Sequence, residues 1–153
     1  MVMPLKLKRF DDFTHIFLVY ASQMAYIEEA HATHAILQKF SELYRYLIKN
    51  DDTSMLKDEL NALLNYLDIQ KNRNQNRFDI VLDNKMKNMD NYIKRLSLLD
   101  FADNIMESAL MRYESHFNIR LELKNDGNPG LTAFLETDDT NEIFDMTLME
   151  EGK

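Results

Sequence analysis

Two places in this 153-residue sequence carry residue types that could take part in chemistry. His15 lies in an apolar stretch, and a neutral imidazole nitrogen is a nucleophile that can accept a phosphoryl group. Asp103 and Asn104 lie side by side in a second apolar segment. An asparagine oxygen that projects from a buried helix can hold Mg²⁺ beside a triphosphate. The residues alone therefore suggest phosphoryl chemistry.

Both places also have a purely structural interpretation, which the residues leave open. An outward histidine on a helix is usually a surface residue, and Asn104 could lie at the partly exposed edge of its helix. The sequence has no Gly-x-Ser-x-Gly elbow and no Walker-type glycine loop. A hydrolase or a P-loop nucleotide site is therefore not indicated.

The remaining histidines give only a weak indication of a metal site. His31 and His34 are three residues apart and follow Glu28 by about one turn, a spacing that could supply nitrogen and carboxylate ligands. We favour exposed polar residues near a bend, and for His116 a structural role at the start of a strand. We therefore expect no metal site.

The first third of the chain predicts a helical hairpin. Two series of apolar residues recur at spacings of four and three, which places each series along one side of a helix. The first series is Phe13, Phe17, Tyr20, Met24 and Ile27, and the second is Ile36, Phe40, Leu43 and Leu47. Such a hairpin would bury its apolar side best against a second copy, as a four-helix bundle. Packing against the rest of the same chain is the alternative.

The rest of the chain predicts an α+β arrangement. Thr53 or Ser54 is expected to cap a third helix, which the polar run from Asn72 to Gln75 ends. A strand, a buried helix and three further strands follow, with a turn at residues 126–130. Their expected ranges are residues 78–83, 96–109, 117–123, 131–136 and 143–149.

Composition and charge narrow the function classes. The net charge is −8, and one lysine stands against eight acidic residues in positions 126–153, so we expect no nucleic-acid partner. The longest stretch without charged residues, 13–27, is too short to cross a bilayer. The chain has no cysteine and no signal peptide, and the cytoplasm is the expected location.

Read in order, these segments resemble the catalytic region of LytS/YehU-type sensor histidine kinases. Residues 14–19 read Thr-His-Ile-Phe-Leu-Val at the place of the family's acceptor segment, and residues 43–47 read Leu-Tyr-Arg-Tyr-Leu. Residues 56–60 read Leu-Lys-Asp-Glu-Leu, residues 65–73 read Asn-Tyr-Leu-Asp-Ile-Gln-Lys-Asn-Arg, and Arg-Phe follows at 77–78. Residues 92–98 then lead into Ala-Asp-Asn-Ile at 102–105, where the family places its metal-binding asparagine.

The resemblance implies two domains and a set of roles. Residues 1–52 would form a helical hairpin for dimerisation and histidine phosphotransfer, and residues 53–153 a partial GHKL-like ATPase sandwich. His15 would be the phosphoryl acceptor, and Asp103 and Asn104 would belong to a vestigial Mg²⁺ and ATP box. The implied partners are a second copy and either a response regulator or a full-length kinase.

Departures from the family pattern argue against autokinase activity. Thr14 replaces the family's proline, Val19 replaces its polar residue, and Glu107 brings a negative charge where triphosphate would approach. The family's Asp-x-Gly turn and glycine-rich lid have no counterpart before the chain ends. We expect a dimeric signalling module with no cofactor, or with ATP and Mg²⁺ only if the nucleotide site works. The alternative is a phosphotransferase, or a fragment of an active kinase, that uses His15.

Overall fold

The computed structural model describes residues 5–125 and 129–148. Within the chain, Met1–Asn50 and Asp51–Lys153 form two compact units. The sequence placed this division after residue 52. Each unit is described by itself below.

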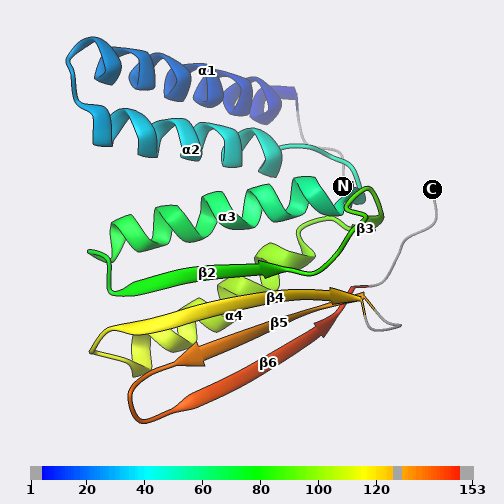
Figure 1. Cartoon of the computed structure of the whole chain (residues 1–153). Coiled ribbons are helices and arrows are strands. Elements are labelled where there is room, and N and C mark those ends of the chain that lie inside the picture. Colours follow the sequence, from blue (N-terminus) through cyan, green and yellow to red (C-terminus); the bar gives the residue numbers. More distant parts are fainter. Residues whose placement is uncertain (1–4, 126–128, 149–153) are drawn as a thin grey trace. The chain divides into compact units, whose positions relative to one another are not determined.

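The first unit is a helical hairpin, as predicted (Figure 1). Helix α1 (Leu5–Ile27) and helix α2 (His31–Leu47) run in opposite directions. The chain reverses over three residues, and Glu29 supplies the sharp bend with a positive φ of 60°. No glycine or proline marks this bend, which is why the sequence did not locate it.

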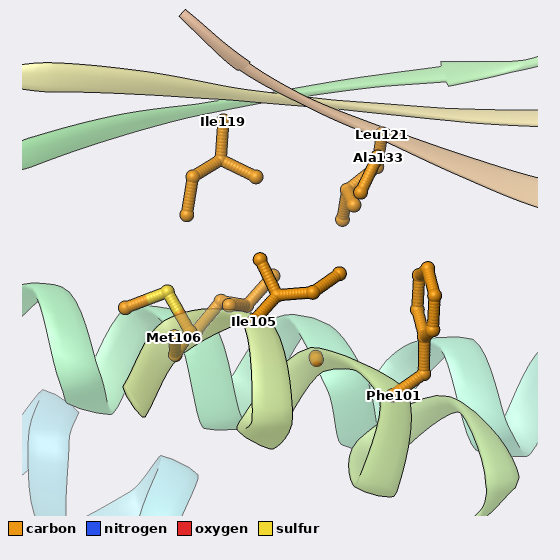
Figure 2. A pocket seen from close by; sticks show the side chains of 8 residues that line it. Phe101, Ile105, Met106, Ile119, Leu121 and Ala133 are labelled. Atoms are coloured by element: carbon orange, nitrogen blue, oxygen red, sulfur yellow. The ribbon is translucent and has the colours of Figure 1, made fainter. Parts of the chain in front are cut away.

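The second unit is α+β, with a mixed four-stranded sheet in the order β2-β4-β5-β6. Strands β2 (Phe78–Asn84) and β4 (Phe117–Asn125) are parallel, because helix α4 (Ser97–Arg112) lies between them in the chain. Strands β5 (Pro129–Glu136) and β6 (Asn141–Thr147) continue the sheet antiparallel. Helix α3 (Leu56–Arg73) and α4 pack on one face of the sheet (Figures 1 and 2).

The predicted cap of the third helix is wrong. Thr53 and Ser54 belong to a short strand, β1 (Thr53–Met55), which pairs antiparallel with β3 (Tyr92–Lys94). The residue at the helix N-cap is Met55, which makes no side-chain cap hydrogen bond. Pairing with β3 buries Ser54 opposite Ile93, so the backbone ladder replaces the expected side-chain cap. Strands of three residues are too short to show an alternating pattern in the sequence.

The core of the second unit is formed by alternate residues of the strands and by the apolar sides of α3 and α4. Every second residue of β4 is buried, and the residues between them face the opposite side of the sheet. Four side chains from β4 enter the core in this way, together with residues of α3, α4 and β5. The four are Phe117, Ile119, Leu121 and Leu123.

Charged side chains hold both ends of α4. The Glu59 side chain is 0 % exposed, and its Oε1 accepts a hydrogen bond from the Ser97 backbone N–H at 3.1 Å. At the other end, the Arg77 guanidinium donates hydrogen bonds to the carbonyl oxygens of Leu110 and Tyr113. An anion at a helix N-terminus and a cation at its C-terminus both favour the helix dipole. Two residues outside α4 therefore fix where this helix lies.

We predict that Glu59→Ala lowers the free energy of unfolding by about 2–4 kcal/mol, because it leaves the start of α4 without its buried acceptor. Chemical denaturation followed by circular dichroism measures the change. Asp58→Ala is the control, since Asp58 is exposed in the same helical turn, and it should cost less than about 1 kcal/mol. Equal losses in both variants would contradict the capping role of Glu59.

Candidate functional site

The two helices of the hairpin approach each other through small and polar side chains. Ser22 and Ala25 on α1 and Ser41 on α2 are all buried. His34 Nδ1 lies 2.8 Å from the Ser22 carbonyl oxygen, which can only accept, so the Nδ1 carries the proton. Ser22 Oγ lies 3.0 Å from the same nitrogen. These contacts give His34 a structural role.

A second polar contact joins the far ends of the two helices. Tyr44 donates its hydroxyl proton to Asp11 Oδ1 at 2.6 Å. This hydrogen bond to a carboxylate is the main reason that the pKa of Tyr44 lies above its ordinary value. Together with the contact between Ser22 and His34, it fixes the alignment of α1 against α2.

Because small residues fill the space between the helices, the large apolar residues of α1 point outward. The side that the sequence predicted as an apolar stripe is 36–69 % exposed along its whole length. We call this surface the α1 stripe: Phe13, Phe17, Tyr20, Met24 and Ile27, with Ile16 beside it. On α2, Phe40 and Leu47 are also exposed, whereas Leu43 is buried. One hairpin therefore presents an unusually large apolar surface.

His15 is partly exposed and lies away from the α1 stripe. It follows Phe13 by two residues, about 200° around the helix. Val19 and Tyr26 lie on this other side of α1 and are also exposed. His15 is thus accessible to an incoming group even if the α1 stripe is covered.

Asp103 and Asn104 are both exposed on α4, but Asp103 already has a partner. Tyr66 on α3 donates its hydroxyl proton to Asp103 Oδ1 at 2.5 Å, and Gln70 Nε2 donates to the Tyr66 hydroxyl oxygen at 3.3 Å. Burial, followed by the hydrogen bond to Asp103, raises the pKa of Tyr66 above its ordinary value. The Asp103 carboxylate therefore ties α4 to α3.

One cavity in this unit lies between α4 and the sheet and is entirely apolar (Figure 2). Side chains of α4, among them Ile105 and Met106, point toward Ile119 and Leu121 of the sheet. Its volume of about 10 Å³ is close to the minimum that holds one water molecule. A nucleotide does not fit in this space, and no polar group lines it. Its complete lining is Leu67, Phe101, Ala102, Ile105, Met106, Ile119, Leu121 and Ala133.

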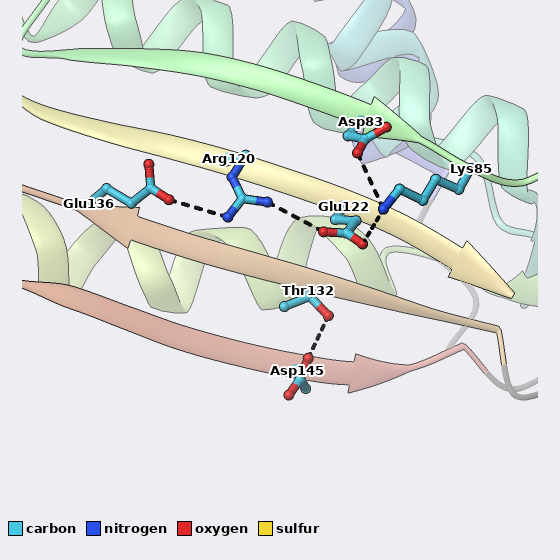
Figure 3. A network of polar contacts seen from close by, with 7 residues as sticks. All are labelled: Asp83, Lys85, Arg120, Glu122, Thr132, Glu136 and Asp145. Carbon is cyan, nitrogen blue, oxygen red and sulfur yellow. Dashed lines mark hydrogen bonds and ion pairs between the residues drawn. The ribbon is translucent and has the colours of Figure 1, made fainter. Parts of the chain in front are cut away.

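The other face of the sheet carries a network of charged side chains (Figure 3). Arg120 contacts Glu122 and Glu136 at 3.3 Å each, and Lys85 contacts Glu122 at 2.9 Å. The hydrogen bond from Lys85 is the main cause that lowers the pKa of Glu122. Glu122 and Glu136 each lie beside a cation, and Asp145 accepts a hydrogen bond from the Thr132 hydroxyl, so the network stabilises neighbouring strands rather than offering a reactive group.

The structure gives no support to a metal site or a membrane span. Among residues 5–125 and 129–148, no cluster of three or more histidine or acidic side chains is arranged to bind a metal ion. His34, one member of the weak histidine motif, is held by Ser22 instead. Within the same residues, no helix has the length and apolar character needed to span a bilayer. His116 contacts Asp79 at 3.0 Å, in keeping with a structural role.

Sequence reasoning missed the residues that position α4. Glu59 and Arg77 lie in segments that resemble the histidine kinases, but the resemblance assigns neither of them a role. A signal for Glu59 was available, because it lies between Leu56 and Leu60 on the apolar side of a helix, where an acidic residue needs a partner. No comparable pattern marked Tyr66, since its partner Asp103 is 37 residues away.

A comparison with protein-family models finds a similarity over most of the hairpin and the whole of α3. Residues 13–78 match the family model described as histidine kinase. Over these residues the chain is similar to histidine kinases. It runs from Phe13 on α1 through α2, β1 and α3 to the first residue of β2. A search of curated proteins gave no significant match.

We predict that Tyr66→Phe makes stability less sensitive to alkaline pH. The unfolded chain releases the Tyr66 proton near the ordinary pKa of 10.0, whereas the folded chain retains it to higher pH. Stability gained from Tyr66 is therefore complete below pH 10.0 and is lost as pH rises above it. Unfolding in urea between pH 9 and pH 11 measures this difference.

Above that pKa the wild type should lose up to about 1.4 kcal/mol per pH unit more than Tyr66→Phe. Because the Tyr66 hydroxyl is exposed to solvent, the extra loss of stability should be smaller than this upper value. Asp103→Ala, which removes the acceptor of the Tyr66 hydroxyl proton, should reduce the difference in the same direction. Parallel pH curves for wild type and Tyr66→Phe would show that the hydrogen bond to Asp103 is unimportant.

Proposed function

We propose that this chain is a two-component signalling protein of the LytS/YehU type of histidine kinase that acts as a dimeric regulatory or binding module without autokinase activity. On this proposal the hairpin forms a four-helix bundle with a second copy, and the second unit is a GHKL-like domain. The observation that carries the proposal is the exposed α1 stripe, within the segment that matches histidine kinases.

The spacing and exposure of the α1 stripe favour a second copy as its occupant. Its five residues follow one another at intervals of four, three, four and three, the repeat that packs helices into left-handed bundles. The hairpin interface is already filled by small residues, so α2 of the same hairpin does not cover the stripe. Two identical hairpins related by a twofold axis would cover each other's stripes and form one closed assembly.

Three features of α4 support the absence of autokinase activity. The Asp103 carboxylate is engaged by Tyr66, and Glu107 is exposed one turn after Asp103 with a like charge. The nearby cavity is apolar and far smaller than a nucleotide. Phosphoryl transfer from ATP requires positioned cations and donors around the triphosphate, and acidic groups oppose its approach.

The partner of the dimer would be a response regulator or a full-length kinase. Val19 offers an exposed apolar contact one turn after His15, and Tyr26 lies about 16 Å from His15 along the same side of α1, which dimerisation leaves free. We infer that the partner docks there.

The same geometry favours one alternative, in which His15 accepts a phosphoryl group. The P–O or P–N bond of a phosphorylated partner would break, and a new P–N bond would form to an imidazole nitrogen of His15. This phosphotransfer needs no ATP site in the chain. A fragment of an active kinase would use His15 in the same way.

Sedimentation equilibrium should show a dimer for the wild type and a much weaker one for Phe17→Glu, because a carboxylate within the apolar contact is strongly disfavoured. We expect at least a tenfold increase in the dissociation constant, about 1.4 kcal/mol. Val81→Glu is a matched control, since both side chains are 56 % exposed but Val81 lies on the sheet. A wild type that stays monomeric at high concentration would refute the dimer.

Isothermal titration of the wild type with ATP and Mg²⁺ should give no heat of binding, and Asn104→Ala should behave identically. Tight binding that Asn104→Ala abolishes would contradict the loss of autokinase activity. Incubation with a phosphorylated response regulator tests the alternative function, in which His15 accepts a phosphoryl group. Label that appears on the wild type but not on His15→Ala would establish phosphotransfer, and label on neither would exclude it.

A further inference from the structure

Strand β6 is an edge strand that lacks the usual protection against further pairing. It ends the sheet order β2-β4-β5-β6, and within residues 5–125 and 129–148 no strand pairs with its outer side (Figure 1). Natural edge strands are commonly blocked by lysine, by proline or by a β-bulge. The sequence of β6, Asn-Glu-Ile-Phe-Asp-Met-Thr, contains neither lysine nor proline, and its register with β5 continues without a bulge. The outer side of β6 can therefore accept another strand.

Alternate residues of β6 direct their backbone groups away from β5. The Leu148 N–H donates to the Pro129 carbonyl oxygen at 2.8 Å, and the Thr137 N–H donates to the Thr140 carbonyl oxygen at 2.9 Å. In the register of the two strands, these bonds place the even-numbered residues of β6 in hydrogen-bonded pairs with β5. The N–H and C=O groups of the odd-numbered residues therefore point to the outer side. These residues are Asn141, Ile143, Asp145 and Thr147.

The side chains of β6 alternate between the two faces of the sheet. Ile143 is 58 % exposed, and Asp145 is exposed on the face that carries the charged network (Figure 3). Phe144 and Met146 are partly buried and pack against the core on the other face. A strand added to β6 would continue both faces. Its side chains would lie beside Phe144 and Met146 on one face, where apolar residues fit, and beside Ile143 and Asp145 on the other.

Charge determines which residues fit beside Asp145. Residues 129–148 contain five acidic residues and no lysine or arginine. Glu142 has partners within the chain, since Arg112 Nη1 donates to its Oε1 at 2.6 Å, and this bond is the main cause that lowers the pKa of Glu142. Asp145 Oδ1 accepts a hydrogen bond from the Thr132 hydroxyl at 2.5 Å, and Asp145 makes no ion pair within the described part of the chain. The edge therefore favours lysine or arginine, whereas a second copy would bring the acids of its own β6.

We propose that β6 binds an extended segment of a partner protein, which adds a fifth strand to this sheet and in which apolar residues alternate with lysine or arginine. The backbone of the segment bonds to the odd-numbered residues of β6 and provides affinity. Its apolar side chains extend the core beside Phe144 and Met146, and its cations lie beside Asp145, which provides specificity. β6 lies outside the segment 13–78 that matches histidine kinases, and this binding does not require two hairpins to associate.

A seven-residue peptide of alternating lysine and valine, equal in length to β6, tests strand addition on the full chain. Fluorescence anisotropy of the labelled peptide should show saturable binding. Two control peptides should bind at least tenfold more weakly: one with glutamate in place of lysine, and one with methylated backbone nitrogens, which cannot donate to the carbonyl groups of β6. Absence of saturable binding below about 1 mM of the lysine peptide would overturn the proposal.

Ile143→Lys and Val81→Lys form a matched pair of variants. Both side chains are β-branched and similarly exposed, 58 % and 56 %, but Val81 lies on β2 at the other edge of the sheet. Both substitutions add one positive charge, and circular dichroism checks that both variants fold. Ile143→Lys should weaken binding of the lysine peptide at least tenfold, and Val81→Lys less than threefold. Equal weakening would place the peptide on the face of the sheet rather than at β6, and would overturn the proposal.

Amide hydrogen exchange of the wild type locates the peptide without any substitution. Bound peptide should slow exchange at least tenfold at residues 143 and 145, whose N–H groups point outward, and less than threefold at residue 144, which is bonded to β5. Unaltered exchange at residues 143 and 145 with peptide bound would contradict strand addition.

Sedimentation distinguishes a second copy from a basic partner. A wild-type dimer that Ile143→Lys dissociates and Val81→Lys does not would assign β6 to a second copy, and would overturn the proposal. Phe17→Glu should leave peptide binding unchanged, because the α1 stripe takes no part in it. Strand addition can therefore fail while the dimer of the proposed function stands, and the reverse is equally measurable.

Discussion

The close approach of α1 and α2 through small residues is the constraint on which this account depends. Ser22, Ala25 and Ser41 are the small residues buried in the hairpin, and the contact between Ser22 and His34 fixes the alignment of the two helices. The aromatic and long aliphatic residues of α1 are therefore displaced to the outside. Since exposed apolar surface is costly in water, a contact that covers the α1 stripe would be favourable.

In the second unit, charged side chains fix the position of α4, which apolar packing alone would not determine. An apolar helix on an apolar sheet can slide with little change in buried area, because hydrophobic contact has no direction. Glu59 and Arg77 remove this freedom, since each binds backbone groups at one end of α4. Tyr66 and Asp103 add a third directional contact between the helices. A residue that looks like part of a nucleotide site therefore has a structural use here.

Periodicity predicted most of the elements of the fold, and in α3 and β4 it also predicted the side that meets the core, whereas the apolar side of α1 is exposed. The alternation in residues 117–123 and the three- and four-residue spacings of the helices correspond to β4, α1 and α3 in the structure. The end of the last predicted strand, residue 149, lies outside the described residues. The three-residue strands β1 and β3 had no such signal, and a capping serine was therefore predicted where a strand lies.

The candidate site was less predictable, because its contacts join residues far apart in sequence. Glu59 meets Ser97, and Tyr66 meets Asp103, across separations that no local pattern records. The roles of His15 and Asn104 stay predictions, since they concern groups that would arrive from outside the chain. The association of two hairpins is the claim that connects them.

A spin-label experiment tests that association most directly. The chain has no cysteine, so Glu28→Cys creates a single attachment point at the exposed bend of the hairpin, outside the α1 stripe. Pulsed electron resonance on the labelled protein should give one narrow distance between two copies, because a twofold axis relates the two hairpins in the proposed bundle. A signal that decays as for isolated molecules, with no defined distance, would contradict the account.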